Sequence, residues 1–327
     1  MIITKTPMRI SMGGGGTDLP FFYSKYGGSL VSATIDKYVY IATNKRFEKK
    51  IRLAYSVIEE VGDIDNLKND RAKEAFRLLD IKNSLDVTTV ADLPSRSGLG
   101  GSASFLVGLL NGLHRAKGEI TSKKILAEEA CKIEMDILKY PVGKQDQYAV
   151  SYGGINHLKI DKKGNVRISP INISEESISL LEKNIMLFYT GIRRDSKDVL
   201  NSQKKNAESD ENRMSFMKEI MKIGEKSRKS LERGDTDKFG RLLHMHWKLK
   251  QSISNKMSNE KIDHWYSIAI KNGALGGKII GAGGGGFLMF YTRNFHEKIS
   301  KLMEKEGLKK IDFKFDFDGT RTLVDKF

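Results

Sequence analysis

LPSRSGLGGSAS, residues 93–104, is the segment that most narrows the fold of this chain. Its three glycines stand among small hydroxyl residues, and apolar residues at helical spacing follow at once. Glycines let backbone N–H groups approach a ligand closely, while the N-terminus of a helix adds unpaired donors and the positive end of its dipole. The segment therefore predicts a phosphate-binding loop that leads into a helix over residues 102–117.

The glycine spacing also matches a dinucleotide-binding fingerprint, GxGxxG/A, at Gly98 and again at Gly281. That fingerprint needs a helix after the glycines and an acidic residue about 20 positions on, at the end of the next strand. Both matches fail, because the strand-like FLMFYT follows the Gly281 pattern and another helix opens about 20 residues after Gly98. A Walker A loop and the protein-kinase signatures are absent as well, which leaves a phosphate loop of a third type.

The rest of the chain predicts an α+β fold of two domains. Its 327 residues exceed the usual size of one domain, and strand-like and helical segments alternate without a regular βαβ rhythm. We expect strands over residues 30–43, 51–55, 87–90, 185–190, 278–280, 287–291 and 311–317, helices over 65–79, 102–117 and 122–139, and a helix-rich stretch over 213–271.

Composition indicates a cytoplasmic protein with a solvated, lysine-rich surface, whose positive charge would help to gather phosphorylated small molecules. The net charge is +15, but the lysines are scattered and no nucleic-acid recognition motif accompanies them. The single cysteine, Cys131, excludes an internal disulfide and is expected to be a buried packing residue. Neither a membrane span nor a signal peptide is evident. We therefore expect no nucleic-acid and no membrane partner, and the oligomeric state stays open.

Three segments, in order along the chain, resemble the motifs of the GHMP small-molecule kinases. Residues 93–104 resemble the family's nucleotide loop, the segment from Pro7 to Asp18 its N-terminal substrate motif, and the segment from Lys278 to Gly286 its C-terminal glycine motif. The resemblance implies an α/β N-terminal domain, residues 1–175, with the nucleotide loop and the catalytic aspartate. It also implies a helix-rich, ferredoxin-like C-terminal domain, residues 176–327, on the acceptor side.

The same resemblance implies phosphoryl transfer from ATP with Mg²⁺ as cofactor. Asp146 matches the catalytic aspartate, which either accepts the proton of the acceptor hydroxyl or aligns that hydroxyl. Ser102 and Glu134 match the magnesium ligands, and oxygen ligands are those that magnesium prefers. Without the resemblance, Glu134 would be read as a solvated helix acid. The residues expected to bind ATP are Ser97, Gly98, Leu99, Gly100, Gly101, Ser102 and Ala103.

Basic residues complete the expected catalytic group. Arg9 matches an arginine that family members place near the catalytic aspartate and the transferred phosphoryl group. Lys144, two residues before Asp146, is either a surface lysine or a cation that acts on phosphate or on the pKa of Asp146. His244 and His246 fall in a predicted helix, where packing is the expected role and substrate contact the alternative.

The acceptor is expected to bind at two motifs. They are the first glycine motif, within the segment from Pro7 to Asp18, and the last glycine motif, from Lys278 to Gly286. Asp18 matches the family's aspartate for a substrate hydroxyl, and Arg193 and Arg194 are candidates for a phosphate on the acceptor, since arginine pairs with phosphate in a bidentate fork. Surface charge is the alternative reading of these two arginines. The remaining residues expected at the acceptor are Gly15, Gly16, Thr17, Gly283, Gly284 and Gly285.

Within the family, the segments GGGTDLP, GKQDQY and YTGIRR resemble those of kinases that act on D-glycero-D-manno-heptose 7-phosphate. This resemblance implies phosphorylation of the anomeric C1 hydroxyl, giving the 1,7-bisphosphate for nucleotide-heptose and surface polysaccharide biosynthesis. The nearest alternative is a kinase of an unphosphorylated sugar of the fucose or uronic acid type. A diphosphate decarboxylase on the same fold and a non-catalytic sugar or nucleotide sensor are disfavoured, because the sugar-type motif and the catalytic groups are present.

Overall fold

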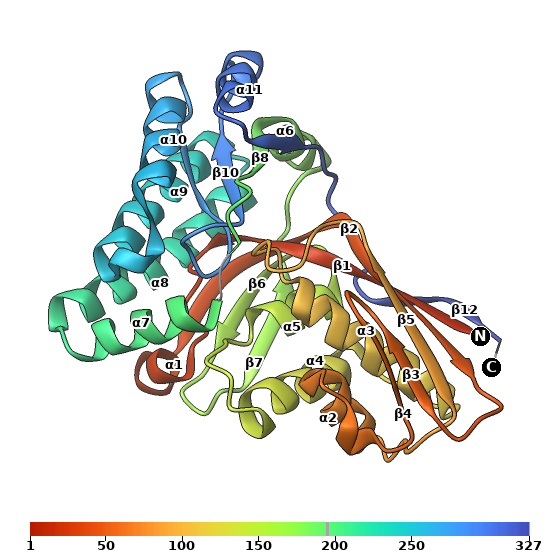
Figure 1. Ribbon diagram of the computed structural model, residues 1–327. Coiled ribbons are helices and arrows are strands. Elements are labelled where there is room, and N and C mark those ends of the chain that lie inside the picture. The colour runs from red at the N-terminus through yellow and green to blue at the C-terminus, as the bar shows by residue number, and fades with distance from the viewer. Residues whose placement is uncertain (194–195, 327) are drawn as a thin grey trace.

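The computed structural model describes residues 1–193 and 196–326, and it contains two sheets of different size (Figure 1). The strands of the larger sheet are β1 (Ile2–Gly13), β2 (Gly28–Lys45), β3 (Ile51–Ala54), β4 (Ile58–Val61), β5 (Leu85–Ala91), β6 (Ile155–Ile160), β7 (Val166–Pro170) and β12 (Arg321–Asp325). Their order is β12-β1-β2-β5-β3-β4, and β6 and β7 extend the sheet from β2. Of these pairs, only β3 and β5 are parallel.

The two longest strands, β1 and β2, form the axis of the larger sheet. Strand β2 pairs with β1 along most of its length, with β6 through residues 28–33 and with β5 through residues 39–45. The last eight residues of β1 and the first eight of β2 are all buried. Both strands are therefore rich in apolar and small residues here, with no polar face. Because β1 ends at Gly13, it leads straight into the first glycine motif.

Helices from the first half of the chain pack beneath the larger sheet in Figure 1. They are α2 (Asp70–Leu78), α3 (Gly101–Ala116), α4 (Lys123–Cys131) and α5 (Gln145–Tyr152), while α1 (Pro20–Tyr26) follows the first glycine motif. Helix α3 is almost entirely buried because it lies close to β1 and β2. At Gly108 a Cβ atom would stand only 2.8 Å from Thr6 Oγ1, so a side chain there would push the helix off the sheet.

The second half of the chain builds a four-stranded antiparallel sheet and its helices, at the top and left of Figure 1. The strands are β8 (Ile185–Tyr189), β9 (Gly276–Ile279), β10 (Phe287–Tyr291) and β11 (Lys309–Ile311), in the order β11-β8-β10-β9. The helices are α6 (Glu175–Asn184), α7 (Ser196–Glu208), α8 (Glu211–Glu232), α9 (Thr236–Ile253), α10 (Glu260–Lys271) and α11 (His296–Lys305). The succession from β8 to β11 is strand, helices, two strands, helix, strand, which is the expected ferredoxin-like arrangement.

A continuous core joins the two sheets. One hydrophobic cluster includes Leu106 of α3, Leu99 of the nucleotide loop, and Ile280 and Phe287 at the last glycine motif. Helix α8 packs on β1 and β2, and helix α9 packs on β9. Strand β12 returns to pair with β1, and Figure 1 shows the two termini side by side. The division at residues 175 and 176 falls at the start of α6 and stays a prediction.

Most predicted elements agree with the structure, and the α+β class is confirmed. The strand predicted over 311–317 is wrong beyond Ile311. There the chain crosses from the smaller sheet to the larger one, so Phe315 makes only an isolated bridge with Ile35. The helix predicted over 65–79 begins at Asp70, because Asn69 caps it. In the described ranges, no helix combines the length and apolar character that a membrane crossing requires.

Candidate active site

The nucleotide loop has the backbone geometry that its glycines predict. Gly98 and Gly100 have φ angles of 86° and 77°, a region that side chains other than glycine rarely adopt. Gly100 is the residue before α3, and no side chain caps that helix, so its first N–H groups stay available to a ligand. Ser97, Leu99 and Ala103 are buried, whereas Ser102 is exposed in the first turn of the helix. This arrangement favours binding of a phosphate chain at the loop.

Arg9 and Asp146 form a bidentate ion pair. Arg9 Nε donates to Asp146 Oδ1 at 2.8 Å, and Nη2 donates to Oδ2 at 2.6 Å. The remaining terminal nitrogen, Nη1, donates to the Gly98 carbonyl at 2.6 Å, and the Arg9 backbone N–H donates to the Leu99 carbonyl at 2.9 Å. Arg9 is buried, while the Asp146 side chain stays 30% exposed, so the aspartate keeps access to a substrate. One arginine thus joins the aspartate in α5 to the nucleotide loop.

Asp18 is the second carboxylate of the site. Its Oδ1 accepts the Gly16 N–H at 3.1 Å, and its Oδ2 accepts the Gln145 N–H at 3.0 Å. Burial raises the pKa of Asp18; the hydrogen bond from Gln145 lowers it, and the nearby charge of Asp146 raises it further. A Cβ atom at Gly143 would lie 1.9 Å from Asp18 Oδ2, so only glycine fits there. The first glycine motif therefore meets the start of α5 next to Asp146.

Glu134 is not the solvated helix acid that its local sequence suggests. It is 2% exposed and lies in a π-helical turn, Lys132–Ile137, that continues α4. Its Oε1 accepts Arg71 Nε at 2.7 Å and its Oε2 accepts Gln147 Nε2 at 2.6 Å. A carboxylate has about four lone-pair sites, so these two bonds leave capacity for a cation. In the part of the chain that the structure describes, no cluster of three His, Cys, Asp or Glu side chains forms a metal site.

The structure directs Lys144 away from Asp146. Its Nζ donates to the Gly164 carbonyl at 2.6 Å, in the turn between β6 and β7, and lies 5.8 Å from the centroid of the Tyr23 ring. The residue precedes α5 and is half-buried. A part in catalysis would require its ammonium group to leave this carbonyl.

The last glycine motif packs directly on the nucleotide loop. A Cβ atom at Gly281 would stand 2.7 Å from the Gly98 carbonyl oxygen, and one at Gly286 would stand 2.2 Å from that of Ser97. Gly284 donates its N–H to the Met257 carbonyl at 2.6 Å, and Gly283 and Gly285 lie against Met257 and Ile192. The three predicted motifs therefore converge. The absence of side chains is what lets the last motif reach the loop.

Thr17 and Arg193 are two further residues expected at the acceptor. Thr17 is buried and donates its hydroxyl to the Gly14 carbonyl at 2.7 Å, so it holds the first glycine turn. Arg193 is exposed on the segment that follows β8. Arg194 lies outside the described residues.

Buried basic groups from the C-terminal half were not expected at this site. Lys278 of β9 is 1% exposed and Lys250 of α9 is 3% exposed, and Lys250 Nζ donates to the Gly281 carbonyl at 2.6 Å. Burial lowers the pKa of Lys278, and the neighbouring Lys250 and Arg9 lower it further. His246 is fully buried, and burial followed by the charges of Lys278 and Lys250 lowers its pKa. These groups favour an anion at this end of the site.

The sequence pattern indicates that these basic groups are buried. Lys278 interrupts the buried strand GGKI, and the spacing of Phe239, Leu243, His246 and Lys250 places all four on the face of α9 that is buried. A charged residue in such a position needs a partner or a ligand.

Two family models match the chain, the GHMP kinases N terminal domain over residues 67–154 and the GHMP kinases C terminal over residues 227–302. The chain is also 31% identical to the D-glycero-alpha-D-manno-heptose 7-phosphate kinase of Campylobacter jejuni, over 98% of both chains. The chain belongs to the GHMP kinase family. It is thus an ATP-dependent kinase, as the resemblance implied.

Further similarities of this GHMP kinase agree with that placement. The galactokinase of Pyrococcus furiosus is 24% identical, over 96% of this chain and 95% of the relative. The crystal structure of a D-glycero-D-manno-heptose 1-phosphate kinase from Bacteroides thetaiotaomicron superposes with a TM-score of 0.82, at 23% identity and with all of both chains covered. At that identity the superposition confirms the fold alone.

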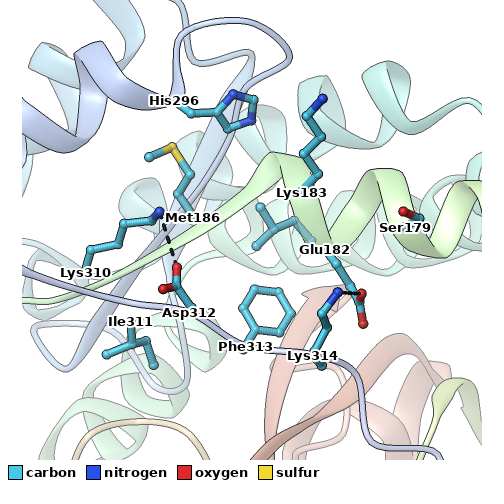
Figure 2. A pocket seen from close by; sticks show the side chains of 11 residues that line it. Ser179, Glu182, Lys183, Met186, His296, Lys310, Ile311, Asp312, Phe313 and Lys314 are labelled. Atoms are coloured by element: carbon cyan, nitrogen blue, oxygen red, sulfur yellow. Dashed lines mark hydrogen bonds and ion pairs between the residues drawn. The ribbon is translucent and has the colours of Figure 1, made fainter.

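A separate pocket lies in the C-terminal half of this GHMP kinase (Figure 2). It has a volume of about 340 Å³ and is lined by side chains from α6, β8, the start of α11 and the segment around β11. Lys310 pairs there with Asp312 at 3.3 Å, and Lys314 pairs with Glu182 at 2.8 Å. No residue expected at the active site lines it, so we treat it as distinct from the catalytic centre.

Proposed function

We propose that this GHMP kinase transfers the γ-phosphoryl group of ATP to the anomeric C1 hydroxyl of D-glycero-D-manno-heptose 7-phosphate. The product would be the 1,7-bisphosphate, a precursor for nucleotide-activated heptose and surface polysaccharide. The observation that carries the proposal is the 31% identity, over nearly the full length of both chains, to a relative named as a heptose 7-phosphate kinase. The Arg9–Asp146 pair, which also bonds the nucleotide loop at Gly98, supports the phosphoryl-transfer part of the proposal.

Each group at the site has a defined task in this proposal. The nucleotide loop and the N-terminus of α3 bind the phosphates of ATP. Asp146 aligns the C1 hydroxyl or takes its proton while the hydroxyl oxygen attacks the γ-phosphorus and ADP leaves. Arg9, held by Asp146 and by the Gly98 carbonyl, places a positive charge beside the transferred group. Asp18 holds a second hydroxyl of the acceptor.

We assign Mg²⁺ to oxygen groups of Ser102 and Glu134. Ser102 presents an exposed hydroxyl in the first turn of α3, and Glu134 presents a carboxylate with free lone pairs. These two residues would hold the ion, which takes few protein carboxylates and completes its shell with phosphate oxygens and water. When bound, the ion neutralises charge on the phosphates.

The phosphate of the acceptor is assigned to Arg193 and Arg194, beyond β8. Arg193 is exposed, so its guanidinium group is accessible to a ligand. A guanidinium group binds phosphate through two parallel N–H bonds, which a lysine cannot supply.

An assay of ATP consumption over a panel of acceptors tests the substrate. The panel contains heptose 7-phosphate, the free heptose, galactose, fucose and a uronic acid. We expect the highest kcat/KM for heptose 7-phosphate, and a lower value for the free heptose because it lacks the phosphate. Turnover of free sugars with none of heptose 7-phosphate would refute the proposal and favour a kinase of an unphosphorylated sugar.

A further inference from the structure

Four buried polar side chains surround the turn formed by Gly15 and Gly16. They have polar atoms that find no hydrogen-bond partner anywhere in residues 1–193 and 196–326. The four, which we call the polar cluster, are Ser11 of β1, Gln145 of α5, Gln203 of α7 and His246 of α9, which are 3%, 6%, 1% and 0% exposed. The atoms concerned are Ser11 Oγ, Gln145 Nε2, Gln203 Oε1 and both ring nitrogens of His246.

Each member of the polar cluster lies against this one turn. A Cβ atom at Gly15 would stand 2.7 Å from Ser11 Oγ and 3.6 Å from Gln145 Oε1, and one at Gly16 would stand 2.8 Å from Gln203 Nε2. His246 adjoins the backbone of Gly15, although neither ring nitrogen reaches it with hydrogen-bond geometry. The turn carries on to Asp18, and the backbone N–H of Gln145 already bonds that carboxylate. The polar cluster is therefore part of the acceptor side of the site.

Such an arrangement is unusual for packing alone. A buried polar atom without a partner destabilises a folded protein, and native structures keep few of them. Here several gather at one turn, and two elements of each half of the chain supply them. Together they offer an amide donor, an amide acceptor, a hydroxyl and an imidazole. A polyhydroxylated ring complements this mixture, because each of its hydroxyls both donates and accepts.

We infer that Ser11, Gln145, Gln203 and His246 bind the ring hydroxyls of the acceptor sugar and set which sugar is accepted. This inference rests on the proposed function and extends it from the reacting hydroxyl to the rest of the ring. Binding in this way requires the turn at Gly15 and Gly16 to shift, because the four side chains are buried against it. Through Gln203 and His246, the C-terminal half contacts the acceptor directly and helps to select it.

The test compares matched substitutions on the full chain. Gln203→Met keeps the shape of the side chain and removes its amide, whose Oε1 has no partner and whose Nε2 donates only to Met217 Sδ at 3.2 Å. Gln251→Met makes the same change on α9 at a position outside the site, where the amide bonds Asp263. We expect Gln203→Met to raise the KM for heptose 7-phosphate about 10-fold or more, to leave the KM for ATP unchanged and to keep or raise the melting temperature. Gln251→Met should change neither KM.

Monodeoxy analogues of the acceptor then identify the contact. For one analogue, the kcat/KM of the wild-type enzyme should be about 10-fold lower than for the full acceptor. Gln203→Met should have the same kcat/KM for that analogue and for the full acceptor, because the contact is already absent. His246→Leu should act in the same way on another position of the ring, and His246→Gln should restore part of the loss because it keeps a donor and an acceptor.

Two outcomes would overturn the inference. One is an unchanged acceptor KM in both variants. The other is a fall in melting temperature with equal losses for every analogue, which is the result of a purely structural role. An enzyme that uses only free sugars would instead refute the proposed function. The same variants and deoxy analogues would then be measured on that sugar, so the two claims fail separately.

Discussion

Arg9 is the residue through which the parts of the active site meet. Its guanidinium bonds Asp146 twice and the Gly98 carbonyl once, and Gly98 in turn lies against Gly281 of the last glycine motif. Since a bidentate pair fixes both partners in one plane, Asp146 has a defined position relative to the nucleotide loop before any substrate binds. The chemistry proposed here depends on that position.

Replacing Asp146 by asparagine tests its role. The variant keeps a hydrogen-bond acceptor for Arg9 but cannot take a proton. We expect kcat to fall about 10²- to 10⁴-fold, with binding of ATP, measured by calorimetry, nearly unchanged. Asp136→Asn, at an exposed acid of the π-helical turn, is the matched control and should keep wild-type turnover. A fall in kcat below about 10-fold in Asp146→Asn would contradict this assignment.

Asp18 predicts a pH dependence of stability. Its pKa is raised in the folded chain above its ordinary value of 3.8, chiefly by burial. The folded state therefore holds a proton that the unfolded state releases, and folding becomes less favourable as the pH rises from 3.8 through the folded-state pKa. Asp18→Asn does not lose stability in this way as the pH rises, because asparagine does not titrate. Urea unfolding at roughly pH 4 and roughly pH 7 should show the stability of the variant gaining on that of the wild type; a constant difference would show that the pKa is not raised.

Some contacts of the site residues can be predicted from the sequence, and others cannot. Arg9 and Asp146 belong to recognisable motifs, and the structure brings these two side chains together. Glu134 bonds Arg71, which lies outside the quoted motifs, and Gln147, which follows Asp146 in GKQDQY. Neither contact could be predicted, because contacts across the fold leave no mark on local spacing. Lys144 stands beside Asp146 in sequence, yet its side chain bonds Gly164, because direction depends on the whole surrounding structure.

At the scale of elements, the site is an arrangement of turns held by close backbone contacts. The first motif ends β1, the second begins α3, the third joins β9 to β10, and a fourth turn precedes α5. Glycine permits these approaches where any side chain would collide. The sequence predicts that the nucleotide loop binds phosphate and that the first and last glycine motifs bind the acceptor. It does not predict that the last glycine motif packs on the nucleotide loop.

Gly143→Ala tests one of these approaches. Gly143 does not have a positive φ, so the substitution adds no backbone strain, and its effect comes from the Cβ atom that would collide with Asp18. We expect a loss of about 1–3 kcal/mol in the free energy of unfolding and a higher acceptor KM. Gly62→Ala, where nothing lies within 4 Å of the added atom, is the control. Equal stability of the two variants in urea unfolding would show that the turn at Gly143 can relax.

The predicted boundaries of helices and strands were wrong where tertiary contacts override a local sequence pattern. The alternation of Phe313, Phe315 and Phe317 is typical of a strand, but Phe313 and Phe315 are buried while the chain passes between two sheets, and Phe317 is exposed. The helix predicted over 122–139 contains a π-helical turn, which periodicity does not reveal. That turn carries Glu134, so an irregularity falls at a candidate functional residue.

At the scale of the whole molecule, the two halves of the chain supply different parts of one site. The first half provides the nucleotide loop, Arg9 and the two aspartates, the second half provides buried basic groups, and both halves, as we infer, provide hydroxyl-binding side chains. A shared hydrophobic core and the return of β12 to β1 connect the halves. The reaction follows from the family, and the identity of the acceptor is the part that still needs a direct test.

The most direct measurement is phosphorus NMR of the product formed from heptose 7-phosphate and ATP. We expect a sugar bisphosphate with two resonances, one of them coupled to the anomeric proton, together with one ADP for each sugar consumed. A new phosphate on any other carbon, or ADP released without a phosphorylated sugar, would contradict it.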